Sequence, residues 1–428
     1  MKKNIKHNWR RLDNSGKIFP IATNKKNSVI FRFSILLTER INKDILEEAA
    51  NITINKYKSF KIKLKAGFFW YYFEQNEKRV KVEKENDYPC KYINAKDNND
   101  YLFKITYFKK KINIDILHLM TDGNSGLTFF KEIVYTYLEL LHPNLSDNTN
   151  SLNIIPENLS TEDSYLEHNA KPLTKQQDKK VLAHQIKGTL IKLDGISAIH
   201  YIIDLPKLKI EAQKYNATIT QYLTALLIYA IYLETHTKNN HKPITICIPV
   251  NLRFFFPSNT LSNFFSHINT SVNMNIATGD ILTYIISYVK KDFKEKLTKE
   301  EMQKSIYSNV KIGDNFGIKI LPLFFKKIFT GFVYTQIRKD TVTMTHSSLG
   351  KIEIEDKYKQ YINYFLVLLS PEKIEKIKCS SCTYDNNLTV SFTSILNNNK
   401  IEKRFYNLLL ERNIPTKIES NGVLNDIS

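Results

Sequence analysis

The residues of this chain best suited to chemistry are His118, Asp122 and Gly123, which form the pattern His-x-x-x-Asp-Gly. Histidine has an ordinary pKa near neutrality, so a histidine beside a cleft can take a proton from a substrate. The aspartate can hold a charged partner, and the glycine after it can adopt backbone angles that other residues avoid. The spacing therefore indicates a proton-accepting base that is presented by a tight turn.

The sequence around His118 predicts the elements that position it. Residues 111–117 alternate isoleucine with polar side chains, which is typical of a β-strand. Residues 125–141 carry the apolar spacing of a helix, and Asn124 or Ser125 can cap its first turn. We therefore expect a strand that ends at His118, then a turn, then a helix.

Strands and helices are interleaved along the rest of the chain as well. We expect strands at 29–36, 200–203 and 244–250, hairpins at 60–72, 102–117 and 383–396, and helices at 42–56, 207–215, 219–234, 281–296 and 400–412. The chain divides into an N-terminal lobe (1–150), a polar linker (151–185) and a C-terminal lobe (186–428). The predicted fold class is mixed α/β (α+β), with each lobe a mostly mixed sheet and flanking helices.

Composition narrows the classes of function. The 428 residues are 42% apolar and include only 12 Gly and 12 Pro, which excludes a fibrous chain. The net charge of +19 favours an anionic partner, but zinc-finger spacing and aromatic RNA-recognition motifs are absent, so we expect no nucleic acid. The most apolar stretch, 318–334, is interrupted by Lys326 and Lys327, which predicts no transmembrane segment. The basic N-terminus lacks the apolar run of a signal peptide, which predicts a cytoplasmic protein.

The cysteines do not predict a metal site. Cys379 and Cys382 form one Cys-x-x-Cys pair, and no second pair completes a zinc site. They stand just ahead of a strand-like run, and we interpret them as small residues at a β-rich edge. No bound metal or cofactor is expected.

The unit of strand, His118-x-x-x-Asp122-Gly123 and helix resembles the core motif of the chloramphenicol-acetyltransferase-like superfamily, which includes peptide-synthetase condensation domains and alcohol acetyltransferases. Further segments resemble the bacterial alcohol-acetyltransferase and condensation-like branch, and the similarity covers residues 10–412. These segments are Arg11-Leu12-Asp13-Asn14, Ile18-Phe19-Pro20, Gly67-Phe68-Phe69-Trp70-Tyr71-Tyr72, Ile248-Pro249-Val250-Asn251-Leu252-Arg253, Asn263-Phe264-Phe265 and Leu349-Gly350. The resemblance implies two lobes with an active-site tunnel between them.

The resemblance also implies roles for the matched residues. His118 corresponds to the general base for direct attack of an acceptor on an acyl thioester, without an acyl-enzyme. Asp122 corresponds to a residue that points away from the substrate into an ion pair, and Arg253 is its expected partner. Gly123 corresponds to a residue with a conformational role.

Other matched positions leave alternatives open. Asn263 either lines the tunnel or has a capping role. Relatives commonly carry Ser-Asn-Leu-Gly where this chain has Ser347-Ser348-Leu349-Gly350, so Ser347 or Ser348 is either a donor to the thioester oxyanion or a loop serine. Leu117 replaces the first of two histidines that the family often carries, and the plant-type motif Asp-Phe-Gly-Trp-Gly is absent.

The implied reaction moves an acyl group from acyl-CoA, or from a phosphopantetheine-linked acyl thioester, to a small-molecule hydroxyl or amine acceptor. Both donors are anionic, so the charge of +19 suits both, and an acidic acyl or peptidyl carrier protein is a candidate partner. We expect a monomer. The alternatives are a stand-alone condensation-like enzyme forming an amide or ester on carrier-bound substrates in secondary metabolism, a catalytically silent binding module of the same fold and, on charge alone, a nucleic-acid binder.

Overall fold

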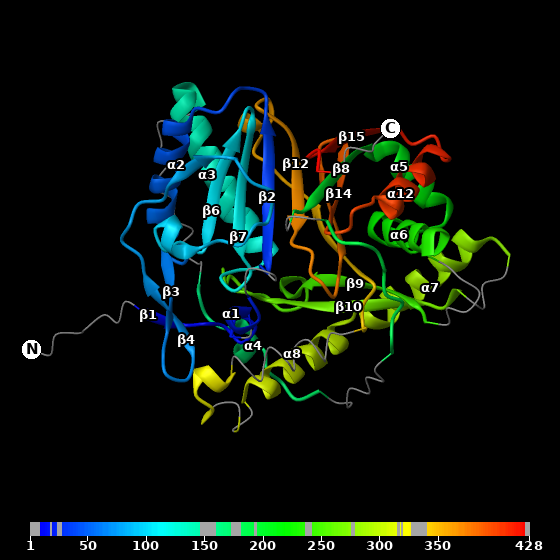
Figure 1. Ribbon diagram of the computed structural model, residues 1–428, viewed down its shortest axis with the longest axis horizontal. Helices are drawn as coiled ribbons and strands as arrows, with labels where there is room; N and C mark the ends of the chain where they lie inside the picture. Colours follow the sequence, from blue (N-terminus) through cyan, green and yellow to red (C-terminus); the bar gives the residue numbers. More distant parts are fainter. Residues whose placement is uncertain are drawn as a thin grey trace, which may run out of the picture.

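Two lobes of mixed α/β structure lie side by side in the computed structural model (Figure 1), as the sequence predicted. The first lobe is built on a five-stranded sheet and the second on a seven-stranded sheet. The structure describes residues 9–17, 19–23, 28–145, 160–172, 181–191, 195–235, 242–274, 279–314, 317, 320–326 and 340–423. Several predictions above fall partly outside these ranges, at residues 18, 146–159, 173–180, 318–319 and 327–334.

The first sheet carries the strand that ends at His118. Its strands, from one edge to the other, are β12 (Ile362–Leu369), β2 (Ile30–Leu37), β7 (Lys111–Leu117), β6 (Phe103–Phe108) and β5 (Val82–Lys84). Neighbouring strands pair antiparallel, except that β5 and β6 are parallel. The predicted hairpin at 102–117 is therefore confirmed as β6 and β7, and it leaves His118 at the end of a central strand.

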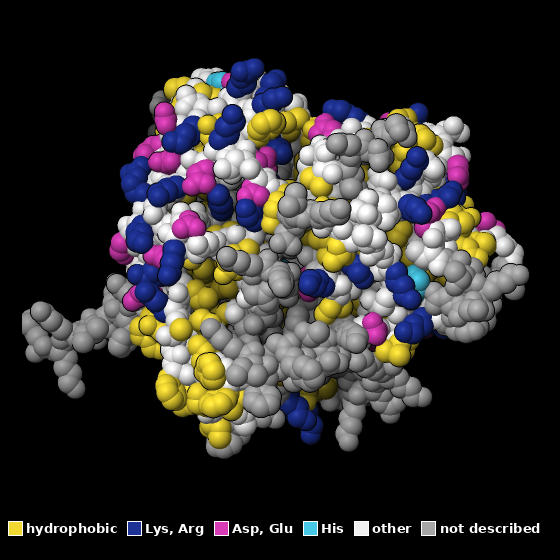
Figure 2. Space-filling model, viewed as in Figure 1, with side chains coloured by type: hydrophobic (Ala, Val, Ile, Leu, Met, Phe, Trp, Pro, Cys, Tyr) yellow, Lys and Arg dark blue, Asp and Glu magenta, His cyan; other side chains and the backbone are white. Residues whose placement is uncertain are grey.

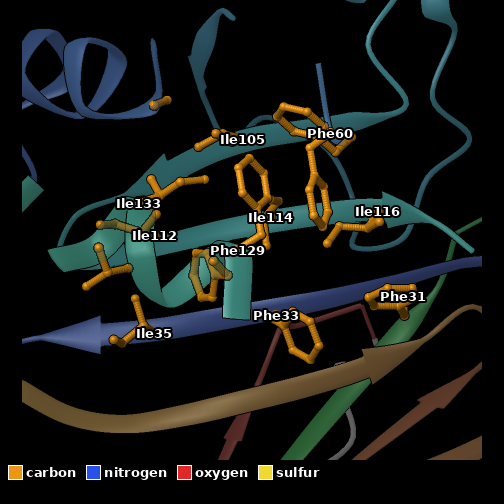
Figure 3. Close-up of a cluster of buried hydrophobic side chains, with 14 of the residues drawn as sticks. Phe31, Phe33, Ile35, Phe60, Ile105, Ile112, Ile114, Ile116, Phe129 and Ile133 are labelled. Atoms are coloured by element: carbon orange, nitrogen blue, oxygen red, sulfur yellow. The ribbon is translucent and has the colours of Figure 1, made fainter. Parts of the chain in front are cut away.

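Apolar packing on one face of this sheet fixes the orientation of β7. Two helices, α2 (Lys43–Lys56) and α3 (Gly123–Leu141), pack together on that face. The three isoleucines of β7 are buried there among aromatic side chains (Figure 3). Phe129 of α3 stacks on Phe60 with ring centroids 4.1 Å apart. The alternating isoleucines thus define the core face, because successive side chains of a strand point to opposite sides.

The opposite face of the same sheet is polar and also buried. Arg32 of β2 donates from Nε and Nη2 to the two carboxylate oxygens of Asp115, at 2.8 and 2.6 Å, and it also pairs with Glu85. Asn113 accepts a hydrogen bond from Ser34 at 2.7 Å. The polar residues that alternate with isoleucine in β7 therefore face a hydrogen-bonded layer, because a buried polar group needs a partner.

The second lobe surrounds the larger sheet with helices. Its strands, in order, are β10 (Phe265–Val272), β9 (Ile244–Asn251), β11 (Met344–Lys351), β13 (Ile377–Tyr384), β14 (Asn387–Ser394), β8 (Ser197–Asp204) and β15 (Thr416–Ser420). Its longer helices are α5 (Leu205–Lys214), α6 (Ile219–Thr235), α7 (Ile281–Lys296), α8 (Lys299–Asp314) and α12 (Lys400–Leu410). The helices predicted at 281–296 and 400–412 are confirmed. Within the described ranges, no helix combines the length and apolarity that a membrane span requires.

Strand β12 crosses between the lobes. Residues 362–369 fall within the C-terminal lobe predicted from sequence, yet the strand pairs with β2 and completes the first sheet. Two hydroxyl groups of β14 donate hydrogen bonds to the backbone of β12. Thr389 Oγ1 donates to the Phe365 carbonyl at 2.7 Å, and Thr393 Oγ1 donates to the Leu369 carbonyl at 2.6 Å. The predicted division at residue 186 therefore does not hold for this strand, which belongs to one sheet and is bonded to the other.

Smaller elements complete the structure. A three-stranded sheet has the order β1 (Trp9–Arg11), β4 (Tyr71–Gln75) and β3 (Ile62–Ala66), and the short helices are α1 (Phe19–Ala22), α4 (Ser164–Glu167) and α11 (Asp356–Lys359). Helix α4 lies in the predicted linker. Its Tyr165 is buried and donates from Oη to the Phe265 carbonyl at 2.7 Å, so this part of the linker is packed against the second lobe.

The two cysteines of the Cys-x-x-Cys pair do not lie at an edge. Both are buried in β13, a central strand of the seven-stranded sheet. Cys379 packs in the core of the second lobe and Cys382 in the core of the first, because a spacing of three puts side chains on opposite faces of a strand. Burial raises the pKa of Cys382 to about 12. The predicted edge position is wrong, and the two thiols do not face one another.

We predict that Phe129→Ala lowers the free energy of unfolding by about 3–5 kcal/mol, because it leaves a cavity in a fully buried aromatic cluster. The measurement is a urea titration followed by intrinsic fluorescence. Phe108→Ala is the matched control, since Phe108 is 40% exposed at the β6–β7 turn and should change stability little. Equal midpoints for the two variants would contradict the packing described for α3.

Candidate active site

His118 lies directly after β7, where the two lobes meet. Its backbone N–H donates to the Val29 carbonyl at 3.1 Å, which extends the pairing of β2 and β7 by one residue. Its ring contacts Phe19 and Phe31 from the first lobe and Phe265 from the second, with centroids 5.0–5.1 Å apart. The residue as a whole is half-buried. The imidazole therefore sits in an apolar setting at the lobe junction; the predicted tunnel stays a prediction.

Asn263 forms a hydrogen bond with one nitrogen of the His118 ring. Asn263 Oδ1 lies 3.2 Å from His118 Nδ1, and Asn263 Nδ2 donates to Asp13 Oδ2 at 3.1 Å. An ionised carboxylate accepts hydrogen bonds and cannot donate, so the amide nitrogen of Asn263 must face Asp13 and its oxygen must face the ring. The ring therefore carries its proton on Nδ1, and Nε2 is left with a free lone pair.

Asp13 is buried and accepts hydrogen bonds from N–H donors. Its carboxylate accepts hydrogen bonds from the backbone N–H of Gly16 at 2.6 Å and of Asn263 at 3.3 Å, besides the Asn263 amide. Burial raises the pKa of Asp13 to about 6, and these hydrogen bonds oppose that rise. Above this pH the carboxylate is ionised, which is the form that orients Asn263.

The surroundings of His118 favour its neutral form. Burial lowers the pKa of His118 below its ordinary value of 6.5, while hydrogen bonds to its own backbone and to Asn263, and the nearby Asp122 charge, act in the opposite direction. A neutral imidazole can accept a proton, so the apolar contacts keep the ring available as a base at neutral pH. Asp122 acts on this ring through its charge.

The Asp122 carboxylate ties the turn to both lobes. It caps α3 by accepting a hydrogen bond from the Ser125 N–H at 3.0 Å. Its other oxygen accepts from Arg253 Nη1 at 2.7 Å and from the Phe264 N–H at 2.8 Å. Both the ion pair with Arg253 and the adjacent backbone contact thus come from the second lobe, so one side chain holds the helix start and the lobe junction together.

Arg253 extends this connection over a second loop. Nη2 donates to Ser125 Oγ at 3.1 Å and to the carbonyls of Thr260 and Ser262 at 2.8 and 3.0 Å. The guanidinium is planar and presents several N–H groups in fixed directions, which is why one arginine can serve these acceptors together. Arg253 therefore joins the α3 turn to the loop that leads to Asn263.

Two predictions about the turn require correction. The helix begins at Gly123 and is capped by Asp122, and neither Asn124 nor Ser125 is the cap. Gly123 does not have a positive φ angle; instead a β-carbon there would lie 3.3 Å from Leu349 Cδ2. The glycine lets the Leu349 side chain of β11 approach closely, and it does not adopt an unusual backbone angle.

The two candidate serines point in different directions from β11. Ser348 Oγ lies 3.3 Å from Thr220 Oγ1, and His346, two residues earlier, lies 3.1 Å from Thr224 Oγ1, so this face of the strand meets α6. Ser347 pairs with Ser380 of β13, whose hydroxyl donates to the Val367 carbonyl of β12, so Ser347 lies on the opposite face of β11, toward the first sheet. Ser347 therefore faces the first lobe, and Ser348 faces α6.

Asp13 and the three phenylalanines around His118 are the site residues that the sequence did not predict. Asp13 belongs to a motif that carried the family resemblance, but its contact with Asn263 spans 250 positions, and no local spacing predicts such a contact. Within the described residues, no group of three or more His, Cys, Asp and Glu side chains is placed to hold a metal ion.

Comparisons with known proteins identify the fold. No family model and no curated protein matches the sequence. The first condensation domain of the calcium-dependent antibiotic synthetase, in complex with a substrate analogue, matches with a TM-score of 0.63 and 10% identity over 94% of this chain and 96% of that one. TRI101 of Fusarium sporotrichioides, complexed with coenzyme A and T-2, matches with a TM-score of 0.61 and 10% identity over 96% and 99%.

A third solved structure is similar to the same extent. The TRI3 trichothecene 15-O-acetyltransferase of Fusarium sporotrichioides matches with a TM-score of 0.60 and 9% identity over 94% of each chain. At sequence identities this low, structural similarity shows the fold alone. The chain has the two-lobed architecture that these acetyltransferases and condensation domains adopt, as the sequence resemblance implied.

We predict that Arg253→Met lowers the free energy of unfolding by about 3–5 kcal/mol, because the buried Asp122 carboxylate loses its charged partner. Arg79→Met is the matched control: Arg79 pairs with Glu48 on the surface, where both side chains are more than half exposed, and the loss should stay below about 1 kcal/mol. Urea denaturation of both variants tests this. A stable Arg253→Met protein would show that the ion pair does not hold the lobes.

Proposed function

We propose that this chain, which has the fold of thioester-dependent acyltransferases and condensation domains, transfers an acyl group from an acyl thioester to a small hydroxyl or amine acceptor. The observation that carries the proposal is the state of the His118 ring. Nδ1 faces Asn263 Oδ1, and Nε2 is left to accept a proton on an imidazole that aromatic side chains surround at the lobe junction. Such a ring can accept a proton from a bound acceptor.

The proposed reaction needs no acyl-enzyme. Nε2 of His118 takes the acceptor proton as the acceptor oxygen or nitrogen attacks the thioester carbonyl carbon, and the carbonyl electrons form an oxyanion. When the oxyanion collapses, the carbon–sulfur bond breaks and the thiolate leaves. The His118 imidazolium returns the proton to that thiolate. Asp122 and Arg253 are positioning residues in this scheme, since they hold the turn.

Ser347 is the proposed donor to the oxyanion. It lies on the face of β11 toward the first sheet, whereas Ser348 faces α6. A hydroxyl on that side can donate a hydrogen bond to the negative oxygen that forms during attack. Ser348 does not face the first sheet and is not proposed for this role.

The donor is proposed to be acyl-CoA or a phosphopantetheine-linked acyl thioester on a carrier protein. Both donors are anionic, and the chain carries a net charge of +19. TRI101 was solved with coenzyme A, and the condensation domain was solved with a substrate analogue. A condensation-like reaction that joins carrier-bound substrates would use the same His118 and is the second candidate. It differs in requiring a carrier protein.

We predict that His118→Ala lowers kcat for thioester turnover by about two to four orders of magnitude, the usual contribution of a positioned base. The assay presents a panel of acyl-CoA and acyl-pantetheine thioesters with alcohol and amine acceptors, and it measures release of free thiol. His142→Ala, at the far end of α3, is the control and should keep full activity. Full activity of the His118 variant would rule out the mechanism, and inactivity of the wild-type chain on every pair would favour a binding module.

We predict that Asn263→Ala lowers kcat by about one to two orders of magnitude, because the ring loses the partner that sets its tautomer and direction. The acid limb of the pH–rate profile should also move to lower pH, since the Asn263 hydrogen bond raises the pKa of His118. Asn363→Ala, at an exposed position of β12, is the matched control. A variant with lower kcat and an unshifted acid limb would show that Asn263 does not act through the ring.

A further inference from the structure

Five large aromatic side chains project from one corner of the molecule. We name Trp9, Phe68, Phe69, Phe324 and Phe325 the aromatic platform. Phe68 is 73% exposed and Phe324 is 69% exposed, and the other three are between 44% and 47% exposed. Figure 2 shows apolar side chains gathered at the lower left of this face, where the β3–β4 turn meets the segment 320–326. Exposed apolar surface gathered in this way marks an interaction site.

The platform is built on backbone contacts that leave its rings outside. The Leu323 N–H donates to the Phe68 carbonyl at 2.9 Å, and Lys326 Nζ donates to the Phe69 carbonyl at 2.8 Å. Lys326 also lies 3.4 Å above the centre of the Trp70 ring. Leu323 and Lys326 are buried, whereas Phe324 and Phe325 between them are exposed. The two segments are therefore fixed to each other, and their phenylalanines point away from the protein.

The sequence around the platform is strongly basic. Each platform residue belongs to one of three runs, 1–11, 58–73 and 315–339, which hold five, four and five Lys or Arg and no Asp or Glu. These fourteen cations account for most of the net charge of +19. Two of these cations are neutralised by nearby carboxylates, since Lys63 pairs with Glu74 and Lys61 with Glu77. Exposed aromatic rings beside exposed cations still suit an anionic lipid interface: the rings enter the headgroup region and the cations attract the lipid charge.

We propose that the aromatic platform docks this protein on the surface of an anionic phospholipid bilayer. Phe68 and Phe324 are the insertion points, because they are the most exposed rings of the two segments that meet there. Lys65, which is exposed on β3, and Arg11, which is exposed on β1, supply positive charge beside them. The proposal rests on surface residues and is independent of the acyl transfer reaction.

The platform is connected to the active site through β1. Arg10, next to Trp9, donates to Ser262 Oγ at 3.2 Å, and Asn263 follows Ser262 in the chain. After β1 the chain continues to Asp13, which holds Asn263. A docked molecule would therefore bring the lobe junction near the lipid surface.

The test is flotation of the full chain with lipid vesicles. One set is phosphatidylcholine alone, and in the other about a third of the lipid is phosphatidylglycerol. We expect binding to the anionic vesicles that weakens as NaCl is raised, and little binding to the neutral ones. The double variant Phe68→Ser with Phe324→Ser should reduce the partition coefficient at least about tenfold, because the inserted apolar area is lost.

Phe108→Ser is the matched control, since Phe108 is 40% exposed beside Lys109 at the opposite end of the first sheet. It should bind like the wild type, and circular dichroism should show that all variants are folded. The proposal is overturned by absence of vesicle binding, by equal binding of the double variant, or by equal loss in the control. Retention on an oligonucleotide that the double variant loses, without vesicle binding, would assign the platform to nucleic acid instead. Thiol release by the double variant on soluble thioesters is measured separately, so the two proposals fail independently.

Discussion

The ion pair between Asp122 and Arg253 is the interaction on which the arrangement of the site depends. One carboxylate caps α3, accepts the Phe264 N–H and binds the guanidinium, and these groups come from both lobes. A carboxylate buried in this way is stable only with partners for its charge, so the lobes must meet in one relative position. His118 lies four residues before Asp122, and its direction follows from that position.

The same junction controls the protonation of the base. The lobes enclose the imidazole with phenylalanine rings, which disfavour its charged form. The Asp13 and Asn263 pair then decides which nitrogen carries the proton, because a carboxylate can only accept. The long-range polar contacts orient the ring, and the apolar contacts keep it neutral. A proton-accepting ring needs both the polar contacts and the apolar contacts.

The sequence predicted what depends on local pattern. The period of two in β7 and the apolar spacing of α3 placed His118 at a strand end before a helix, and the family resemblance supplied Arg253 as the partner of Asp122. The cap was wrong because Asp122 itself accepts the Ser125 N–H. The reason for Gly123 and the edge position of Cys379 and Cys382 were wrong, since each depends on neighbours distant in the chain: Leu349 and the two cores. Asp13 was missed for the same reason.

Strand β12 has a consequence for biosynthesis. The first sheet needs residues 362–369 at its edge beside β2, although β2 leaves the ribosome more than three hundred residues earlier. Until then the nascent N-terminal half presents an unpaired strand edge, which is a template for association with other chains. The two halves therefore cannot mature in succession, and a truncated product ending before β12 would be a substrate for chaperones or proteases.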